Sequence, residues 1–459
     1  MSGMPRDSLR LLLGRVLGRV AGGLSRGLGR GGGTTLPGKL LIAFDGEAIR
    51  ELGRRLPAGA IAISATNGKT TTASMLAKIL EPHLGLAHNR AGANLASGVA
   101  TALLGAREAE LGVFEADEAA LPEIARQLRP RVLLLGNLFR DQLDRYGELE
   151  LIAEQWHATV TELPPESVVV VNADDPLLAG LARSRARAIS FGIDDEAVAR
   201  GTLPHASDSK YCPACDEPLG YAQIYVGHLG CWACTACGDA RPQLDVAARR
   251  VCVHGLESVS FELVERRVHE QVALSVAGLY NVYNALAAAA AARALEVPLS
   301  DVAAGLERFR PAFGRLQRVV AADRTILLLL IKNPAGANEV IRTLIGAGER
   351  PAVMLALNDG IADGRDVSWI WDVDFEPLMP LADRIVVSGT RAEELALRLK
   401  YGGYDEARLE VHADLAAALD RGLALCEPGS ELPLLPTYTA MLELQRILAD
   451  RGLAEQYWR

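Results

Sequence analysis

Short apolar runs and longer amphipathic stretches alternate along the chain from about residue 38 to residue 200. The apolar runs have the length of buried strands, and the stretches between them repeat their apolar positions at helical spacing. The predicted strands are 40–44, 60–64, 111–115, 132–136 and 168–172, and the predicted helices are 71–80, 95–104, 119–127 and 150–162. This alternation predicts an α/β fold with a mostly parallel sheet and helices on both faces. Ligands of such sheets bind at the carboxyl ends of the strands.

The pattern changes twice further along the chain. Residues 202–246 are rich in Cys, Gly, Pro and aromatic residues, which indicates an insertion, and the α/β pattern resumes over 251–265 and in an Ala-rich helix over 281–295. A second α/β unit follows residue 315, with predicted strands at 325–331, 352–357, 384–388 and 408–411 and a last helix at 439–449. We therefore divide the chain into an arm (1–37), a central domain (38–315) and a smaller, Rossmann-like α/β domain (316–459).

Composition narrows the class of protein. Hydrophobic residues make up 49% and charged residues 23% of the 459 positions, as in ordinary globular proteins. The net charge of −9 argues against nucleic acid as the main partner. No apolar run approaches the roughly 18–20 residues of a membrane-spanning helix, and the N-terminus lacks the pattern of a secretory signal. We expect a cytoplasmic protein.

The N-terminal arm has the pattern of a basic amphipathic helix. Its apolar residues recur at helical spacing beside Arg15 and Arg19, and they are Leu9, Leu12, Leu13, Val16, Leu17 and Val20. Such a helix binds an anionic membrane surface, which for a cytoplasmic protein is the inner face of the membrane, or it packs on the body of its own protein. The sequence supports both interpretations equally.

Residues 60–72 combine a short apolar strand, a polar loop and the start of a helix. Backbone N–H groups at a helix N-terminus favour a bound phosphate, and a Lys adds positive charge. Gly68, Lys69 and Thr70 match the end of a phosphate-binding loop, although Ile63 stands where the full pattern has Gly. The alternative is an ordinary helix N-cap. We predict that this loop binds the phosphates of a nucleotide and that a Thr hydroxyl reaches Mg²⁺.

Two Cys-x-x-Cys knuckles lie within the insertion. Cys212 and Cys215 form the first knuckle, and Cys234 and Cys237 form the second. Four thiolates on two tight turns complete the tetrahedral shell of a structural Zn²⁺ and leave no open position for catalysis. Cys231 lies three residues before Cys234 and is an alternative ligand. We expect this zinc ribbon to stabilise the central domain while sparing the nucleotide contacts.

Further motifs follow the phosphate loop, and together they resemble the Mur ligase family, whose members use ATP to activate a carboxylate as an acyl phosphate. The motifs are Thr66–Thr72, Phe114–Glu118, Asn137 with Asp141–Asp144, Asn172–Pro176, Asn281 with Asn284, and Phe313–Arg315. Three positions depart from the family pattern: Ala65, Gln142 and Tyr280. The loop begins about sixty residues into the chain, so we expect no domain that grips a UDP-sugar.

One branch of this family, the MurT subunits of lipid II isoglutaminyl synthase, shares more local stretches with the chain. They are 137–147, 227–230, 278–284, 332–336, 358–359, 363–369 and 436–439, and the resemblance covers about residues 38–459. It implies that ATP phosphorylates the α-carboxylate of D-glutamate in the lipid II stem peptide. Ammonia then displaces phosphate and leaves D-isoglutamine. In this branch a GatD partner, a glutamine amidotransferase, supplies the ammonia.

The resemblance also implies roles for individual residues. The nucleotide-binding residues are Thr66, Asn67, Gly68, Lys69, Thr70, Thr71, Asn281 and Arg315. Within this set Asn281 is expected near the adenine or ribose-phosphate and Arg315 near the γ-phosphate, against the alternatives of helix capping and a surface cation. Thr70 and Glu115 supply oxygen ligands to Mg²⁺, and Glu115 is counted among the catalytic residues.

In the branch that the chain resembles, an Asp of the ligase subunit completes the catalytic triad of the partner. Asp359, Asp363 and Asp366 share one loop after a predicted strand and are the candidates. Such an Asp accepts a hydrogen bond from the partner's His and stabilises the imidazolium. An Asx turn that caps the loop is the alternative for each of them, and the nearby Trp369 and Trp371 have core packing as their alternative.

Two other functions fit parts of the pattern. A ligase of the folylpolyglutamate synthase type also lacks a UDP-binding domain, but it would use an amino acid instead of ammonia and would lack the zinc ribbon. A scaffold subunit would use its nucleotide only to hold a partner. The presence of Lys69, Glu115 and Arg315 together argues against the scaffold.

Overall fold

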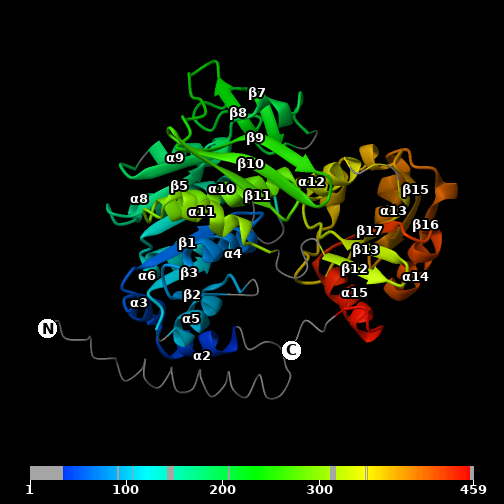
Figure 1. Ribbon diagram of the computed structural model, residues 1–459, viewed down its shortest axis with the longest axis horizontal. Coiled ribbons are helices and arrows are strands. Elements are labelled where there is room, and N and C mark those ends of the chain that lie inside the picture. Colours follow the sequence, from blue (N-terminus) through cyan, green and yellow to red (C-terminus); the bar gives the residue numbers. More distant parts are fainter. Residues whose placement is uncertain are drawn as a thin grey trace.

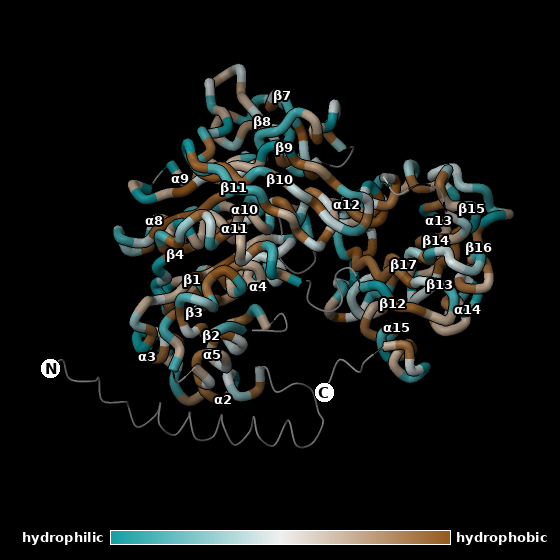
Figure 2. Tube along the Cα trace, in the orientation of Figure 1, coloured by the Kyte–Doolittle hydropathy of each residue, from teal (hydrophilic) through white to brown (hydrophobic). Residues whose placement is uncertain are grey.

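The computed structural model describes residues 35–454 apart from 90–92, 107, 142–148, 184, 205–206, 311–316, 347 and 349. Within these residues the chain forms two α/β bodies side by side (Figure 1). One holds a nine-stranded sheet and the other a six-stranded sheet. Figure 2 shows the hydrophobic segments concentrated inside both bodies. Residues 1–34 of the predicted arm lie outside the described residues, and the domain boundaries at 37 and 315 stay predictions.

The nine-stranded sheet has the order β11-β10-β9-β6-β5-β4-β1-β3-β2. Its parallel strands are β1 (Ala60–Ser64), β2 (Leu86–His88), β3 (Leu111–Glu115), β4 (Val132–Leu135), β5 (Val168–Asn172) and β6 (Ala188–Ile193). The sheet continues with β9 (Val246–His254) parallel to β6, and with β10 (Ser258–Glu265) and β11 (Val268–Leu274) antiparallel. The strand predictions at 60–64, 111–115 and 168–172 are confirmed, and the one at 132–136 ends one residue early.

Successive residues of a strand face opposite sides of a sheet, so β1 contributes to two cores. Ile61 and Ile63 face the core covered by α4 (Lys69–Leu80), α10 (Leu279–Arg293) and α11 (Leu299–Glu307). Ala60 and Ala62 face the core covered by α2 (Leu36–Phe44), α3 (Ala48–Gly53), α5 (Ala96–Gly105), α6 (Leu121–Leu128), α8 (Leu149–Glu162) and α9 (Pro176–Arg183). Because β1 is buried on both faces, the loop that leaves its end starts from a rigid base.

The prediction of a strand at 40–44 is wrong, because these residues form the second half of α2. Pro37 occupies the first turn of this helix, where its missing N–H leaves no bond unmade. A short apolar run fits a buried strand and a helix equally, and packing against α5 decides for the helix. Gly38 allows the two helices to approach closely, since a Cβ there would lie 1.8 Å from the backbone oxygen of Ser97.

The six-stranded sheet has the order β12-β13-β17-β14-β15-β16, and all neighbours except β12 and β13 are parallel. Its strands are β12 (Gln317–Ala321), β13 (Arg324–Leu328), β14 (Arg350–Ala356), β15 (Ala382–Ser388), β16 (Leu409–Val411) and β17 (Glu431–Pro436). Its helices are α12 (Pro334–Ile345), α13 (Ala392–Tyr401), α14 (Leu415–Leu425) and α15 (Tyr438–Asp450). The four strands and the last helix predicted for this unit are present, with ends shifted by a few residues.

Strand β17 was not predicted, although it lies in the middle of the sheet between β13 and β14. It contains Pro433 and Pro436, and a residue without an N–H argues against a central strand. The carbonyl groups still pair: the N–H of Ile331 donates to the oxygen of Pro436 over 2.9 Å. The sheet therefore tolerates both prolines inside this strand.

Between β6 and β9 the chain leaves the first sheet and forms a hairpin, β7 (Leu219–Val226) and β8 (Leu229–Cys234), at the top of Figure 1. A short 3₁₀ turn at Glu196–Val198 precedes it, and three others, at Ser368–Asp372, Glu376–Leu378 and Glu406–Arg408, lie in the second body.

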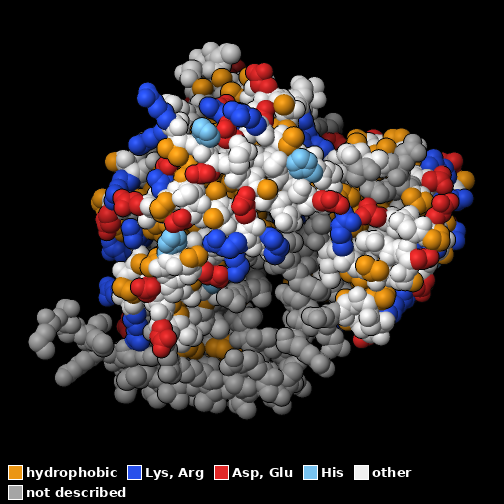
Figure 3. All heavy atoms as spheres, in the orientation of Figure 1, with side chains coloured by type: hydrophobic (Ala, Val, Ile, Leu, Met, Phe, Trp, Pro, Cys, Tyr) orange, Lys and Arg blue, Asp and Glu red, His pale blue; other side chains and the backbone are white. Residues whose placement is uncertain are grey.

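Positive and negative side chains are interspersed on the face shown in Figure 3. No described helix combines the length and the apolar content needed to cross a membrane.

The close contact between α2 and α5 predicts a sensitive position. We expect Gly38→Ala to lower the free energy of unfolding by about 1–3 kcal/mol, since the new Cβ overlaps the backbone of α5. Gly46→Ala is the matched control, because a Cβ at Gly46 meets no atom within 4 Å. Urea unfolding of both variants checks this, and equal stabilities would contradict it.

Candidate active site

The phosphate loop connects β1 to the N-terminus of α4, which begins at Lys69, two residues earlier than predicted. Gly68 precedes the helix with a φ of +88°, in the left-handed region that favours glycine. A Cβ at Gly68 would lie 1.9 Å from Oδ1 of Asn284, so glycine is required for space as well. The first N–H groups of an α-helix have no partners within the helix, and at the N-terminus of α4 they are available to an anion held by the loop.

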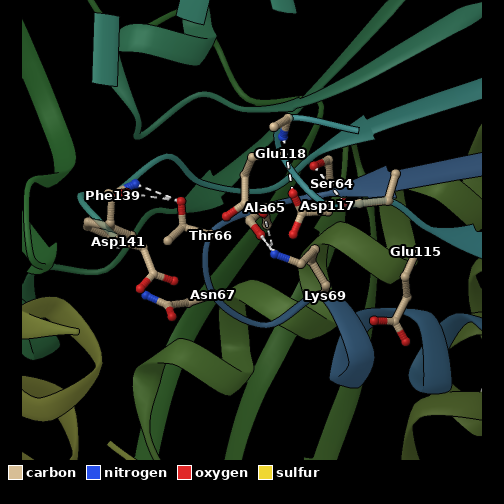
Figure 4. A network of polar contacts seen from close by, with 12 residues as sticks. Ser64, Ala65, Thr66, Asn67, Lys69, Glu115, Asp117, Glu118, Phe139 and Asp141 are labelled. Carbon is tan, nitrogen blue, oxygen red and sulfur yellow. Dashed lines mark hydrogen bonds and ion pairs between the residues drawn. The ribbon is translucent and has the colours of Figure 1, made fainter. Parts of the chain in front are cut away.

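The Lys69 side chain points back toward Ala65 of the loop (Figure 4) and is buried. Its ammonium donates to the carbonyl oxygen of Ala65 over 2.5 Å and to Oε2 of Glu118 over 2.7 Å. Burial raises the pKa of Glu118, but the charges of Lys69 and Lys332 outweigh it, and that pKa ends below its ordinary value. The Glu118 carboxylate is therefore ionised and holds the ammonium in place. The sequence showed Glu118 only as part of an acidic stretch, without its partner.

Thr70 and Glu115 come together as predicted for two oxygen ligands of one cation. The Thr70 hydroxyl donates to Oε2 of Glu115 over 2.9 Å, and Glu115 is 1% exposed. Asn89 exchanges two hydrogen bonds of 2.9 Å with the backbone of Glu115 and so fixes the end of β3. A hydroxyl and a carboxylate are ligands that Mg²⁺ accepts, so the residues present fit this ion.

Asn281 reaches the first turn of α4 through Asn284 rather than by direct contact. Its amide donates to the carbonyl oxygen of Ala277 over 2.7 Å at the start of α10, and its oxygen accepts a bond of 3.1 Å from Asn284. Asn284 in turn accepts from the Thr72 hydroxyl over 3.3 Å. This chain of side chains braces the first turn of α4 against α10. The predicted Arg315 lies outside the described residues, and Thr71 lies in the first turn of α4.

The second body contributes two residues that the sequence marked only as part of a family stretch. The Lys332 ammonium donates to the carbonyl oxygen of Thr66 over 3.1 Å and pairs with Asp141 over 2.6 Å. The amides of Asn333 and Asn67 exchange hydrogen bonds of 3.0 and 3.3 Å. Asn333 is also the N-cap of α12, so a second helix N-terminus begins beside the phosphate loop. A Lys followed by Asn-Pro after a buried strand is the signal that could have revealed this.

The three candidate Asp residues differ in what they bind. Asp359 accepts bonds from Thr390 and Arg391 on its two oxygens, and these bonds, led by the one from Thr390, lower its pKa. Asp363 is buried, which raises its pKa, and both of its oxygens accept bonds from Thr439 at the start of α15.

Asp366 is exposed and accepts the backbone N–H of Ser368 on Oδ1 over 2.8 Å, and this bond is the main cause that lowers its pKa. Asp366 therefore has the Asx-turn geometry that was the alternative to a role in the triad; the turn uses Oδ1, and the carboxylate is ionised at neutral pH. Its bonds go only to Ser368, two residues along its own loop, among the described residues. Asp359 and Asp363, by contrast, are bound by residues of other parts of the chain.

The four predicted zinc ligands lie together outside the phosphate site. The sulfur atoms of Cys212, Cys215, Cys234 and Cys237 lie within 4.8 Å of one another, with Cys212–Cys237 at 3.7 Å and Cys215–Cys234 at 3.5 Å. A tetrahedral shell with Zn–S bonds of about 2.3 Å places sulfurs roughly 3.8 Å apart, so the cluster fits Zn²⁺. Cys231 is not in this cluster, because positions three apart on a strand face opposite sides.

The comparisons with known proteins agree with this geometry. Residues 63–225 match the Mur ligase middle domain and residues 330–441 the MurT ligase C-terminal domain. The chain is 32% identical over 436 residues to the MurT subunit of lipid II isoglutaminyl synthase (glutamine-hydrolyzing) of Streptococcus pneumoniae, covering 92% of this chain and 94% of the relative. It is also 32% identical to the Staphylococcus aureus subunit of that name, over 80% of this chain and 83% of the relative.

The chain belongs to the MurT branch of the Mur ligase family.

Solved structures show the same fold. A pseudomurein peptide ligase type C from Methanothermus fervidus superposes with a TM-score of 0.69 at 22% identity, covering 87% of this chain and 80% of that chain. A Mycobacterium tuberculosis folylpolyglutamate synthase complexed with ADP gives a TM-score of 0.62 at 17% identity, covering 97% and 98%. At these identities the likeness concerns the fold alone. The predicted Mur ligase fold and MurT resemblance are confirmed.

In this MurT chain the Cys cluster predicts a zinc content of one per chain, measured by plasma mass spectrometry after dialysis. We expect Cys215→Ser to lose the metal and Cys231→Ser to keep it. Zinc affinity should fall as the pH drops, because protons compete with the metal for the four thiolates. Metal retained by Cys215→Ser and lost by Cys231→Ser would contradict the assignment.

Proposed function

We propose that this chain is the ligase subunit of a lipid II isoglutaminyl synthase. It uses ATP to amidate the α-carboxylate of D-glutamate in lipid II, with ammonia from a GatD-type glutamine amidotransferase, as a step of peptidoglycan biosynthesis. The observation that carries the proposal is the match to MurT subunits along nearly the whole chain, in which Lys69 and the Thr70–Glu115 pair stand at a phosphate loop. The proposed place of action is the cytoplasm, at the inner face of the membrane that carries lipid II.

The phosphate loop is proposed to hold the β- and γ-phosphates. The N-terminus of α4 supplies backbone donors, and Lys69 supplies positive charge against the negative charge that builds up on the transferred phosphoryl group. Thr66, Asn67, Gly68 and Thr71 shape the same loop, and Asn281 is proposed to support the nucleotide from α10. Bound Mg²⁺ would neutralise phosphate charge, and Thr70 and Glu115 would hold it.

The second body brings a further cation to the loop. A carboxylate oxygen of the substrate attacks the γ-phosphorus and ADP leaves, and ammonia then attacks the acyl carbon and phosphate leaves. Both steps place negative charge beside the loop. Lys332 of the second body lies next to the loop, because its ammonium is 3.1 Å from the carbonyl oxygen of Thr66. Preorganised charge of this kind stabilises such transition states. Arg315 is proposed to join it near the γ-phosphate.

Among the three candidate Asp residues we assign the partner's triad to Asp366. Asp363 ties its loop to α15, and Asp359 is bound to Thr390 and Arg391. Asp366 is exposed, and its low pKa keeps it ionised. An ionised and exposed carboxylate can accept the ring N–H of the partner's His and hold its tautomer.

Exposed apolar side chains, two of which flank Asp366 in the sequence, support docking of the partner there. Ile361 is 85% exposed, Trp371 47% and Tyr401 74%, and the Trp371 and Tyr401 rings lie 6.0 Å apart in an edge-on arrangement. The core alternative for Trp371 is therefore wrong. Exposed Trp and Tyr side chains are typical anchors of protein interfaces.

The first test is mass spectrometry of lipid II incubated with this chain, a GatD-type glutaminase, ATP, Mg²⁺ and glutamine. We expect conversion of one acid to an amide. Lys69→Ala should lower the rate by about 10²–10³-fold, because the transferred phosphoryl group loses its buried cation. Lys78→Ala is the matched control, since Lys78 lies on the same helix, is exposed and pairs only with Glu81 among described carboxylates.

Either of two outcomes would overturn the proposal. ATP consumption stimulated by an amino acid, with no amide formed, would place the chain with ligases of the folylpolyglutamate synthase type. No ATP turnover with partner and substrate present would make it a nucleotide-binding scaffold.

The assignment of Asp366 predicts a split between the two half-reactions. Asp366→Asn should lower glutamine-dependent amidation by about 10³–10⁴-fold, because the neutral amide favours the wrong His tautomer. Amidation by the same complex with added ammonium salt should be unchanged. In Asp359→Asn, glutamine-dependent activity should stay within a few fold of the wild type, and the reverse ranking of the two variants would contradict the assignment.

A further inference from the structure

The turn of the β7–β8 hairpin touches a segment that also supports the phosphate loop. Gly227 and His228 form this turn between the two strands. A Cβ at Gly227, whose φ is +58°, would lie 2.7 Å from Cε1 of Phe139. The rings of His228 and Phe139 have their centroids 4.7 Å apart with 54° between their planes. The ribbon therefore contacts Phe139 closely, with glycine required at the contact.

Phe139 belongs to residues 137–141, which we call the supporting segment. The backbone N–H of Phe139 donates to the Thr66 hydroxyl over 3.0 Å. That hydroxyl lies 3.2 Å from the carbonyl oxygen of Phe139 (Figure 4). Asn137 exchanges two hydrogen bonds of 2.9 Å with the backbone of Asn67. Phe139 thus presents its side chain to the ribbon and its backbone to the phosphate loop.

The insertion that carries the ribbon grips the supporting segment at a second point. Arg140 pairs with Asp208 of the insertion, whose other oxygen accepts the backbone N–H of Arg140 over 3.2 Å. The second body joins the same assembly, because Arg342 of α12 donates to the carbonyl oxygen of Tyr225 in β7 over 3.1 Å. The ribbon therefore contacts both the support of the phosphate loop and the helix that begins beside it.

His228 is buried at the turn between β7 and β8. It is fully buried, and neither ring nitrogen forms a hydrogen bond within the described residues; Nε2 lies 3.5 Å from Oδ1 of Asp175. A buried polar group without a hydrogen bond is destabilising. The ring therefore has two close neighbours, the Phe139 ring and the Asp175 carboxylate.

The metal cluster lies at the other end of the strand that leaves this turn. Strand β8 begins at Leu229, directly after His228, and ends at Cys234, one of the four cluster residues. We propose that the four-cysteine ribbon positions the phosphate loop: metal in the cluster holds β8, and β8 holds His228 against Phe139. Metal occupancy then sets the affinity for nucleotide as well as stability, which departs from the expectation that the ribbon spares the nucleotide contacts. This inference rests on the proposed nucleotide site.

The test is isothermal titration of the full-length chain with ADP and Mg²⁺, well below the melting temperature, with zinc content measured on each sample. We expect His228→Ala and Phe139→Leu to weaken ADP binding about 10-fold, or roughly 1.4 kcal/mol, with zinc content unchanged. His228→Phe should bind ADP like the wild type, because it restores a ring against Phe139 without the ring nitrogens. Circular dichroism confirms that each variant is folded.

Metal removal should act through the same contact. Cys215→Ser should weaken ADP binding to a similar extent, and the double variant Cys215→Ser/His228→Ala should be no more than about 2-fold weaker than either single variant, since coupled residues are not additive. Arg183→Ala is the control, because Arg183 binds the ribbon at Asp239 and Ala240 rather than at the supporting segment. Its ADP affinity should be unchanged.

The possible outcomes separate the two proposals. Wild-type ADP affinity in His228→Ala, Phe139→Leu and Cys215→Ser, with only the melting temperature lowered, would make the ribbon a stabilising element and overturn the inference. Additive losses in the double variant would overturn the route through His228. A wild-type chain that binds no ADP would overturn the proposed nucleotide site itself, before any variant is compared.

Discussion

The site depends on one close contact, in which Gly68 turns the chain in a left-handed conformation against Asn284 and starts α4 at Lys69. Strand β1 is buried on both faces, so the point from which the loop departs cannot shift without disturbing two cores. The contact with Asn284 fixes the direction in which the helix begins. Together they place the N-terminus of α4 at the loop, where its backbone N–H groups favour an anion.

Charge is distributed around this loop in matched pairs. Lys69 lies against Glu118, and Lys332 lies against Asp141, with one cation from each body. Burying a cation without a counter-charge is costly, so each pair makes its lysine possible at this place. Beside the loop the two bodies meet through short polar side chains, Asn67 and Asn333. A polar contact of this kind suits domains that must admit a substrate between them.

The ribbon is more than an attachment to the central sheet. Its turn lies against Phe139, and its strand β7 accepts a hydrogen bond from α12 at the carbonyl oxygen of Tyr225. Its metal cluster lies at the far end of β8. Metal ligation fixes the conformation of a small domain, and segments packed against that domain are then held in place as well. Here it touches the segment that supports the phosphate loop.

Local features of this protein follow from its amino-acid sequence alone. Gly-Lys-Thr after a buried strand, two Cys knuckles and the α/β alternation each depend on neighbouring residues, so the phosphate loop, the four-cysteine cluster and the central strands β1, β3, β4 and β5 were predictable. The strand predicted at 40–44 is a helix, since a short apolar run takes the form that its tertiary neighbours require. Strand β17 was not predicted, because proline lacks the N–H that a central strand uses for pairing and so argues against a strand when only neighbouring residues are considered.

The folded molecule alone decides which residues far apart in the chain come into contact. The pairing of Lys69 with Glu118, the reach of Lys332 to Thr66, and the contact of His228 with Phe139 join residues separated by dozens to hundreds of positions. The same holds for Asp366, which differs from Asp359 and Asp363 in the neighbours that bind their carboxylate oxygens. Spacing along a chain carries no record of such contacts, because they are set by how sheets and helices pack in three dimensions.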